Sequence, residues 1–163
     1  MWISGTTQYA IRAVLYVAEY GGAVPLHVDN ISHALGVPRN YLSKTLHSLA
    51  RAGVLRSERG PRGGFQLAEL PERLTLARVA APFDDLAQRH CLLRQQTCGA
   101  RTACPAHVRW EAISASLTEF FGKTTIADLM RPDSAARVQA ALASRARPGA
   151  RRKRTTTAAT RRK

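Results

Sequence analysis

The sequence predicts a mainly α-helical fold that carries one small β-hairpin. Three observations lead to this fold class. Apolar residues recur at helical spacing in three successive segments before residue 53, and two short strand-like segments follow around a glycine-rich turn. A long apolar ridge then extends from about Pro105 to Gly122, which indicates one further helix. The residues that this helix is expected to bury are Val108, Ile113, Leu117, Phe120 and Phe121. The chain of 163 residues has room for one domain with its own core and a modest appendage.

The first two helices are marked by their ends. We expect Thr6 or Thr7 to cap a helix that ends at Gly21-Gly22. Its apolar positions make a broad stripe for packing: Ala10, Ile11, Val14, Leu15, Val17 and Ala18. A short helix from about Val28 to Leu35 follows and ends at Gly36, which can adopt the positive φ of a C-cap. The residues that this helix is expected to bury are Ile31, Ala34 and Leu35.

A third helix starts directly at Pro38 and is expected to run to about Ala52. Helical spacing turns Leu42, Leu46 and Leu49 toward the core. The opposite face then presents polar side chains to solvent: Arg39, Asn40, Ser43, Lys44, His47 and Arg51. A short helix, a tight turn and a second helix with a polar face together predict a helix-turn-helix.

The residues after Gly53 predict a hairpin, which is the wing of a winged helix-turn-helix. Strand-like segments at 54–57 and 65–67 are separated by residues 58–64, which are all turn-forming types. Arg59 and Arg62 lie at the hairpin tip, where they can reach phosphates or a narrow minor groove. A small helix is expected next, before Pro82, with an apolar face made by Leu74, Leu76, Val79 and Ala80.

The polar face of the third helix has the residue types that read base edges. Arg39 and Lys44 can bind guanine or phosphate, and Asn40 can bind adenine through two hydrogen bonds. Ser43 and His47 lie about one and two turns beyond Arg39 on the same face. An amphipathic helix with a solvated polar face would show the same pattern, but the arginines of the hairpin favour double-stranded DNA as the partner.

Three cysteines are grouped between residues 91 and 104. Cys91, Cys98 and Cys104 are spaced Cys-x6-Cys-x5-Cys, and His107 follows the last thiol by three residues. Thiolates and imidazole suit an iron–sulphur cluster. A Cys3His zinc site is the main alternative, although the short Cys-x2-Cys knuckle is absent. A bare thiol switch is the third, because three nearby arginines favour the thiolate form: Arg89, Arg94 and Arg101.

Net charge is distributed unevenly along the chain. The total is +14, and residues 131–163 hold eleven Lys and Arg with Asp133 as the one acidic residue, so ten of the fourteen net charges lie there. This tail lacks a sustained apolar face, and we expect it to be disordered. Arg12 and Glu19 interrupt the apolar run near the start of the chain. We therefore expect neither a signal peptide nor a membrane span, and a cytoplasmic location.

Two motifs are specific enough to indicate a family. They are VPRNYLSK at residues 37–44 and RGPRGGF at residues 59–65, and the likeness extends from TQYA at 7–10 to TIADL at 125–129. Together they resemble the Rrf2 family of bacterial winged helix-turn-helix regulators, whose members include an iron–sulphur cluster regulator and a nitric-oxide-sensing repressor. The resemblance covers roughly residues 1–130 and implies a transcriptional regulator that binds DNA.

The resemblance also implies that the three cysteines hold an iron–sulphur cluster, of the 2Fe-2S or the 4Fe-4S type. In some relatives the fourth ligand is a His shortly after the third cysteine, which matches His107 in this sequence. Others use an acidic residue in the first helix of the partner subunit, where this sequence has Gln8. Because Gln is a poor iron ligand, this departure favours His107, with His90 as a further candidate.

These observations predict four parts: a winged helix-turn-helix domain at 1–82, a cysteine loop at 83–107, a dimerisation helix with a C-terminal cap at 108–130, and the disordered basic tail at 131–163. We expect a homodimer whose long helices pack together and set two recognition helices about one DNA turn apart. The expected function is a repressor whose DNA binding responds to redox, nitric oxide or iron–sulphur status through the cluster.

Two other classes of function are the alternatives to this interpretation. A thiol oxidoreductase could use the cysteines, but no Cys-x2-Cys pair, catalytic triad or phosphate loop is present, so we do not expect an enzyme. A non-specific binder driven by the basic tail would bind DNA with little sequence preference.

Overall fold

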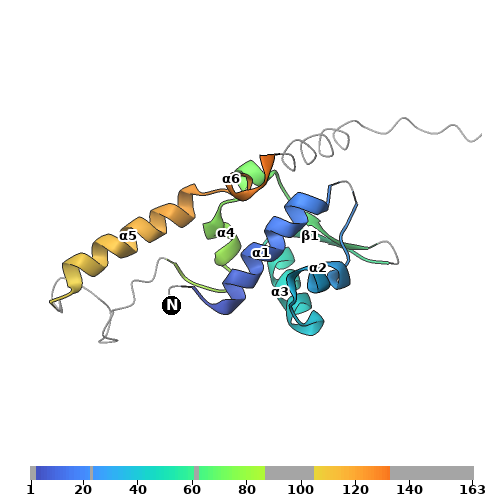
Figure 1. The fold of residues 1–163 in the computed structure, drawn as a ribbon, viewed down its shortest axis with the longest axis horizontal. Coiled ribbons are helices and arrows are strands. Elements are labelled where there is room, and N and C mark those ends of the chain that lie inside the picture. Colours follow the sequence, from blue (N-terminus) through green and yellow to red (C-terminus); the bar gives the residue numbers. More distant parts are fainter. Residues whose placement is uncertain (1–2, 23, 61–62, 87–104, 133–163) are drawn as a thin grey trace, which may run out of the picture.

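The computed structural model describes residues 3–22, 24–60, 63–86 and 105–132. Within these ranges the fold is mainly helical with one two-stranded antiparallel sheet, which confirms the predicted fold class (Figure 1). The elements are α1 (Gly5–Tyr20), α2 (Val28–Leu35), α3 (Arg39–Arg51), β1 (Leu55–Glu58), β2 (Gly64–Leu67), η1 (Pro71–Arg73), α4 (Leu76–Ala80), α5 (His107–Lys123) and α6 (Ile126–Leu129).

Helix α1 is capped by Ser4, whose side-chain oxygen accepts a hydrogen bond from the backbone N–H of Thr7 at 3.2 Å. The expectation that Thr6 or Thr7 caps this helix was therefore wrong. Thr7 instead lies inside the first turn, and its buried hydroxyl donates to a distant residue. Ile11 and Leu15 of the predicted stripe are only half-buried. The fully buried stripe consists mostly of small side chains: Ala10, Ala13, Val14, Val17 and Ala18.

Helices α2 and α3 have the predicted bounds to within one residue. Gly36 between them has a φ of 64° and adopts the left-handed conformation expected of the C-cap. Ile31 is buried as predicted, whereas Leu35 is only half-buried and Ala34 is exposed. The prediction for Ala34 was wrong because a helix of only two turns presents a narrow stripe to its neighbours, and the position beside that stripe stays in solvent.

Strands β1 and β2 form the predicted hairpin, with Leu55 opposite Leu67 and Glu58 opposite Gly64. A third segment pairs with it, which the sequence pattern did not predict. The N–H of Leu26 donates to the carbonyl oxygen of Phe65 at 3.0 Å, and the N–H of Phe65 donates to the carbonyl oxygen of Leu26 at 2.9 Å. This bridge ties the segment between α1 and α2 to the wing.

Gly64 permits that close approach. A Cβ atom at this position would lie 2.4 Å from the carbonyl oxygen of Leu26, and the φ of 153° is one that residues with side chains rarely adopt. Gly63 is equally constrained, because its Cβ would lie 2.2 Å from the carbonyl oxygen of Glu58. The paired glycines of the wing motif are therefore required by backbone packing.

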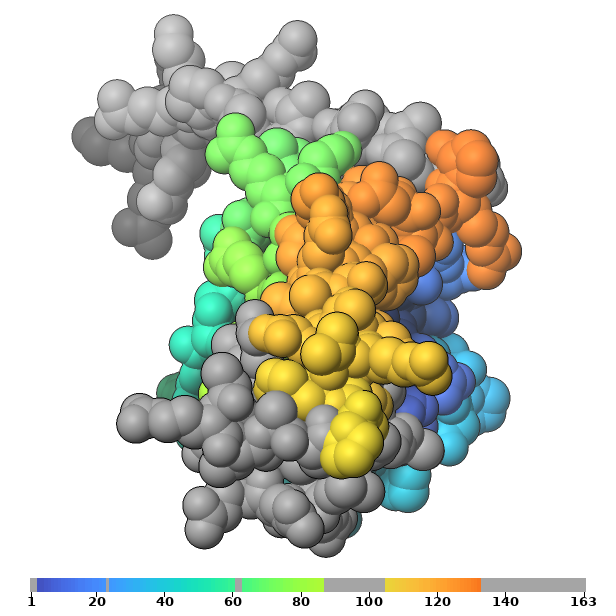
Figure 2. Space-filling model, turned by 90° about the vertical axis from the view of Figure 1, so that its left-hand side faces the viewer, coloured from blue at the N-terminus to red at the C-terminus, as the bar shows by residue number. Residues whose placement is uncertain are grey.

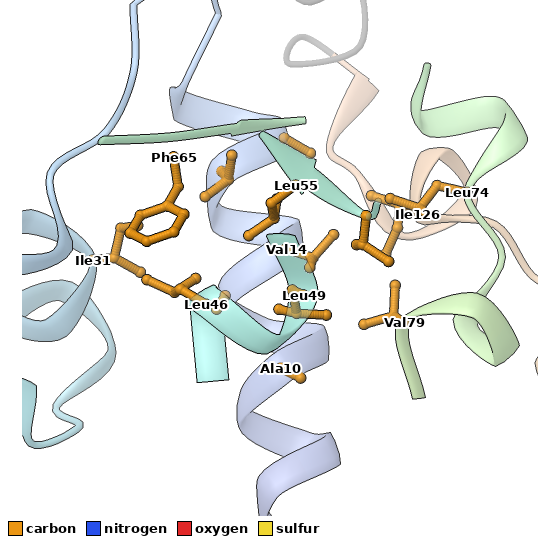
Figure 3. Packing of buried hydrophobic residues seen from close by; sticks show 14 of the residues in the cluster. Ala10, Val14, Ile31, Leu46, Leu49, Leu55, Phe65, Leu74, Val79 and Ile126 are labelled. Atoms are coloured by element: carbon orange, nitrogen blue, oxygen red, sulfur yellow. The ribbon is translucent and has the colours of Figure 1, made fainter. Parts of the chain in front are cut away.

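The core lies between α1, α3, the hairpin and the short helices α4 and α6 (Figure 3). Figure 3 shows Val14, Leu49 and Leu55 converging from three different elements. Two backbone bonds attach α6 to this body: Leu76 donates to Thr124 at 2.9 Å, and Ile126 donates to Leu74 at 2.8 Å. Ile126 is completely buried as a result.

Helix α5 extends away from this body (Figure 1), and its N-terminal part, in yellow, faces the viewer in Figure 2. The sequence pattern predicted that five apolar residues of this helix are buried. Phe121 is buried and Leu117 half-buried, but Val108, Ile113 and Phe120 are exposed by 77%, 55% and 52%. The prediction was wrong for these three within one chain, because only the C-terminal part of α5 meets the core.

Replacing Gly64 with Ala is expected to lower the free energy of unfolding by about 2 kcal/mol or more, because the added Cβ collides with backbone at a strained φ. Urea unfolding followed by circular dichroism measures the change. Gly122→Ala is the matched control, since nothing lies within 4 Å of its Cβ inside α5, and it is expected to be neutral or stabilising. Equal stability of Gly64→Ala and the parent chain would contradict this account of the wing.

Candidate DNA-binding surface and sensor segment

Helix α3 separates an apolar and a polar face as the sequence pattern predicts. Its buried face is formed by Leu42, Leu46 and Leu49, each with no exposed area. The polar side chains lie on the other side. Those that are exposed are Arg39, Asn40, Lys44, His47 and Arg51, and Ser43 is half-buried.

Arg39 forms an ion pair with Asp29, through its Nε and the carboxylate Oδ1. Both side chains are exposed, and Asp29 belongs to the first turn of α2. The pair holds the Arg39 side chain across the turn of the helix-turn-helix. Sequence spacing could not have predicted this ion pair, because Arg39 and Asp29 belong to different helices.

A hollow of about 660 Å³ lies between the second half of α3 and strand β1. Among the described residues that line it none is acidic, and several carry hydroxyl or cationic groups. The lining residues are Ser43, Lys44, His47, Ser48, Ala50, Arg51 and Ser57. Hydroxyl and cationic donors of this kind are suited to an anionic group such as a phosphate. The sequence pattern did not indicate Ser48 and Ser57, because only the folding of β1 against α3 brings them here.

Packing of the wing fixes one wall of this hollow. The ring of His47 meets that of Phe65 edge to face, with 5.3 Å between the ring centroids. Phe65 is itself held by the backbone bridge to Leu26. At the wing tip Arg59 is exposed, and Arg62 lies outside the described residues.

Tyr41 joins α3 to the first turn of α1. Its Oη lies 2.6 Å from Oγ1 of Thr6, and its ring meets that of Tyr9 edge to face, at a centroid distance of 5.8 Å. Tyr41 stands between Asn40 and Leu42 in the chain, so this contact holds the N-terminal end of α3.

Asp84 contacts the same turn of α1 from the other side. Its Oδ2 accepts hydrogen bonds from the backbone N–H of Ser4 at 2.7 Å and from the hydroxyl of Thr7 at 2.6 Å. Burial raises the pKa of the Asp84 carboxyl, but the hydrogen bonds from Thr7 and Ser4 outweigh this effect and hold the pKa below its usual value. The carboxylate is therefore charged at neutral pH.

The three predicted thiol ligands, Cys91, Cys98 and Cys104, lie outside the described residues, as does His90. His107 is the first residue of α5, and its Nε2 lies 3.7 Å from Oε2 of Glu111 one turn further along. Within the described ranges the structure contains no group of three or more His, Cys, Asp or Glu residues that could hold a metal ion.

Comparison with known proteins decides the family. A family model described as "Iron-dependent Transcriptional regulator" matches residues 3–132. The chain belongs to the Rrf2 family. It is 35% identical, over 133 residues, to a protein of Aquifex aeolicus whose name assigns it to the HTH-type transcriptional regulators; the match covers 80% of this chain and 92% of the relative. It is 28% identical, over 130 residues, to the regulator IscR of Vibrio vulnificus, with 80% and 77% covered.

Solved structures support the same fold. CymR of Bacillus subtilis, described as the global cysteine regulator, superposes with a TM-score of 0.66 at 23% identity, over 78% of this chain and 94% of CymR. IscR of T. potens gives a TM-score of 0.63 at 22% identity, over 78% and 84%. Like these Rrf2 regulators, the chain has a winged-helix fold, which confirms the predicted resemblance. It is a transcriptional regulator of a family that binds DNA.

No helix among the described residues is long and apolar enough to cross a membrane. The basic tail predicted at 131–163 lies outside the described residues except for its first two positions.

The hollow beside α3 leads to a prediction about non-specific binding. The DNA used is a duplex selected from a random library for tight binding, called the selected duplex, together with a scrambled duplex. Arg51→Ala is expected to weaken binding to both by similar factors, because phosphates carry no sequence information. The slope of log affinity against log salt should fall by about one. Fluorescence anisotropy titrations at several salt concentrations measure both quantities.

Arg56→Ala is the matched control for this prediction. Arg56 precedes Ser57 on β1 and so faces the other side of the strand. Two results would show that Arg51 does not contact the DNA backbone. One is a loss of affinity confined to the selected duplex, and the other is an equal salt slope in Arg51→Ala and Arg56→Ala.

Proposed function

We propose that the chain is a sequence-specific repressor that binds DNA as a homodimer and whose operator affinity depends on an iron–sulphur cluster. The exposed polar face of α3 beside a basic wing, in a chain of the Rrf2 family, carries the proposal. The functional parts are the winged domain at 1–82, the cysteine loop at 83–107, the dimerisation helix with its cap at 108–130 and the basic tail at 131–163.

Arg39 and Asn40 are the proposed base-reading residues. They occupy the first turn of α3, and the N-terminal end of the recognition helix is the part that reaches base edges. The ion pair between Arg39 and Asp29 is exposed, and such pairs contribute only about 0–1 kcal/mol. A guanine can therefore replace Asp29 as the partner of Arg39 at little cost.

The remaining polar residues are proposed to hold the DNA backbone. Ser43, Lys44 and His47 line the hollow beside β1, where a phosphate would meet hydroxyl and cationic groups. Arg59 and Arg62 of the wing are proposed to contact phosphates or the minor groove of the same duplex.

The exposed apolar face of α5 supports the homodimer. Large apolar side chains stand in solvent along this helix, and a shallow hollow of about 380 Å³ is lined by Ala112, Ile113, Ser116, Leu117 and Phe120. Apolar patches of this kind on a soluble chain are typical of surfaces that another protein covers. Packing two copies of α5 together would bury these exposed apolar side chains. It would also relate the two α3 helices of the dimer by a two-fold axis.

The donor set fits an iron–sulphur cluster. Cys91, Cys98 and Cys104 supply three thiolates, and His107 supplies an imidazole from the first turn of α5. The His107 side chain is mostly buried, with 14% of its area exposed, and its contact with Glu111 can orient the ring. When bound, the cluster supplies a redox-active group that can respond to oxygen or nitric oxide.

The second candidate function is a regulator whose thiols themselves are oxidised. The likeness of fold to CymR, which is described as a cysteine regulator, favours this second function. In that case the same three cysteines would act without metal, as exposed thiolates do in redox sensors.

Asn40→Ala tests sequence-specific reading. Loss of one bidentate base contact is expected to cost about 1–3 kcal/mol, or roughly ten- to hundredfold in affinity for the selected duplex, with a far smaller effect on scrambled DNA. Asn30→Ala, on the exposed side of α2, is the control. An equal loss on both duplexes would mean that Asn40 does not read a base.

Metal analysis of protein purified without oxygen tests the cluster. Iron and acid-labile sulphide are expected, and replacing Cys91, Cys98 or Cys104 with Ser should remove both while circular dichroism still shows a folded chain. Stoichiometric zinc without sulphide would identify a zinc site instead. Absence of both iron and zinc would favour the thiol-based function.

The same preparation tests the fourth ligand. His107→Ala is expected to give a labile cluster with an altered visible spectrum, whereas Gln8→Ala should leave the spectrum unchanged. The reverse result would assign the fourth position to the first helix of the partner subunit.

A further inference from the structure

The first turn of α1 is contacted by two parts of the molecule that are far apart in the sequence. On one side, Asp84 accepts hydrogen bonds from the N–H of Ser4 and the hydroxyl of Thr7, at 2.7 and 2.6 Å. On the other side, Thr6 and Tyr9 hold the side chain of Tyr41 in α3. Asp84 and α3 therefore share one turn of helix as their common support.

Asp84 stands at the entrance to the cysteine segment. It lies two residues before Leu86, the last described residue ahead of the segment that contains all three cysteines. Leu86 is packed against the core, and its carbonyl oxygen accepts a hydrogen bond from the hydroxyl of Thr118 in α5 at 3.4 Å. Residues 84–86 are thus anchored to α1 and α5 together.

The bonds of Asp84 are more than an ordinary helix cap. Ser4 already caps α1 by accepting from the N–H of Thr7. Asp84 uses the Ser4 N–H and the Thr7 hydroxyl instead, across a sequence separation of about 80 residues. Its charge is favoured there, because an anion at a helix N-terminus interacts well with the macrodipole and charge-assisted hydrogen bonds are stronger than neutral ones.

We propose that Asp84 is the positioning residue through which the cysteine segment acts on the recognition helix, by way of Thr6, Tyr9 and Tyr41. The inference rests on the proposed function, because it assigns a route to the regulation proposed there. A change in the cysteine segment that shifts Asp84 moves the first turn of α1, and Tyr41 moves with it. Asn40 adjoins Tyr41 in the chain, so base reading changes with this movement.

A double-mutant cycle tests the route in the full-length protein. The sensor effect is defined as the ratio of the dissociation constants for the selected duplex with and without replacement of all three cysteines by Ser. In the parent chain we expect a ratio in the range of about 5- to 150-fold, as is usual for coupled sites. In Asp84→Ala and in Tyr41→Phe the ratio should fall below about threefold, since each variant breaks one end of the route.

Two features separate this result from mere loss of stability. Tyr41→Phe keeps the ring contact with Tyr9 and removes only the hydroxyl bonded to Thr6, so it remains informative if Asp84→Ala folds poorly. Glu58→Ala removes a carboxylate from the exposed end of β1, outside this route, and should retain the full sensor effect. A ratio that stays at the parent value in both route variants would overturn the inference.

Hydrogen exchange gives a readout that needs neither DNA nor a metal. Asp84→Ala is expected to speed amide exchange in the first turn of α1 and in the N-terminal half of α3, and Glu58→Ala is not. Unchanged exchange in α3 would overturn the inference even if the regulator functions as proposed. A different result would separate the two proposals. If the parent chain shows no sensor effect but Asp84→Ala still speeds exchange in α3, the proposed regulation by cysteines is wrong.

Discussion

The structure depends on the burial of helix α1. Its inner face consists of small residues, and because Ala10, Ala13 and Ala18 have so little bulk, neighbouring elements approach the α1 backbone closely. Helices α2, α3, α4 and α6 and strand β2 all pack against it. Packing at interior density leaves little freedom in such an arrangement, so a shift of α1 must be shared by the elements that contact it.

The DNA-reading surface follows from this arrangement. Helix α3 is held on its apolar face by three leucines and at its N-terminal end by Tyr41. The wing is held by the bridge between Leu26 and Phe65, and the contact of Phe65 with His47 places it beside α3. Recognition helix and wing are therefore positioned by separate contacts with one scaffold, which suits a surface that must match the grooves and the backbone of a duplex at the same time.

The proposed regulation and dimerisation involve parts of the chain other than this scaffold. Helix α5 extends beyond the core with Val108, Ile113 and Phe120 in solvent, and the cysteine segment lies between Asp84 and the start of α5 in the chain. A regulator needs two arrangements that differ little in free energy, and small contacts such as the bonds of Asp84 can bias such an equilibrium. The proposed sensor lies between Asp84 and α5 in the chain, so one chemical event there would reach both the DNA-binding surface and the proposed dimerisation surface.

The sequence by itself determined the local elements and the family. Helical periodicity placed the leucines of α3 on one face, Gly36 marked the turn before it, and the paired glycines marked the wing; these signals depend on neighbours in the chain. The motifs around them indicated the Rrf2 family, and the polar face of α3 indicated DNA.

Only the tertiary structure decided which distant groups meet. The hydroxyl of Thr7 donates to Asp84, which lies 77 residues further along the chain, and the hollow beside α3 is lined in part by Ser57 of the wing. The exposure of Phe120 likewise depends on where the core ends. Such contacts join residues that are far apart in the chain. Their partners are determined by packing and hydrogen-bond satisfaction across the whole fold, and local periodicity and spacing do not indicate them.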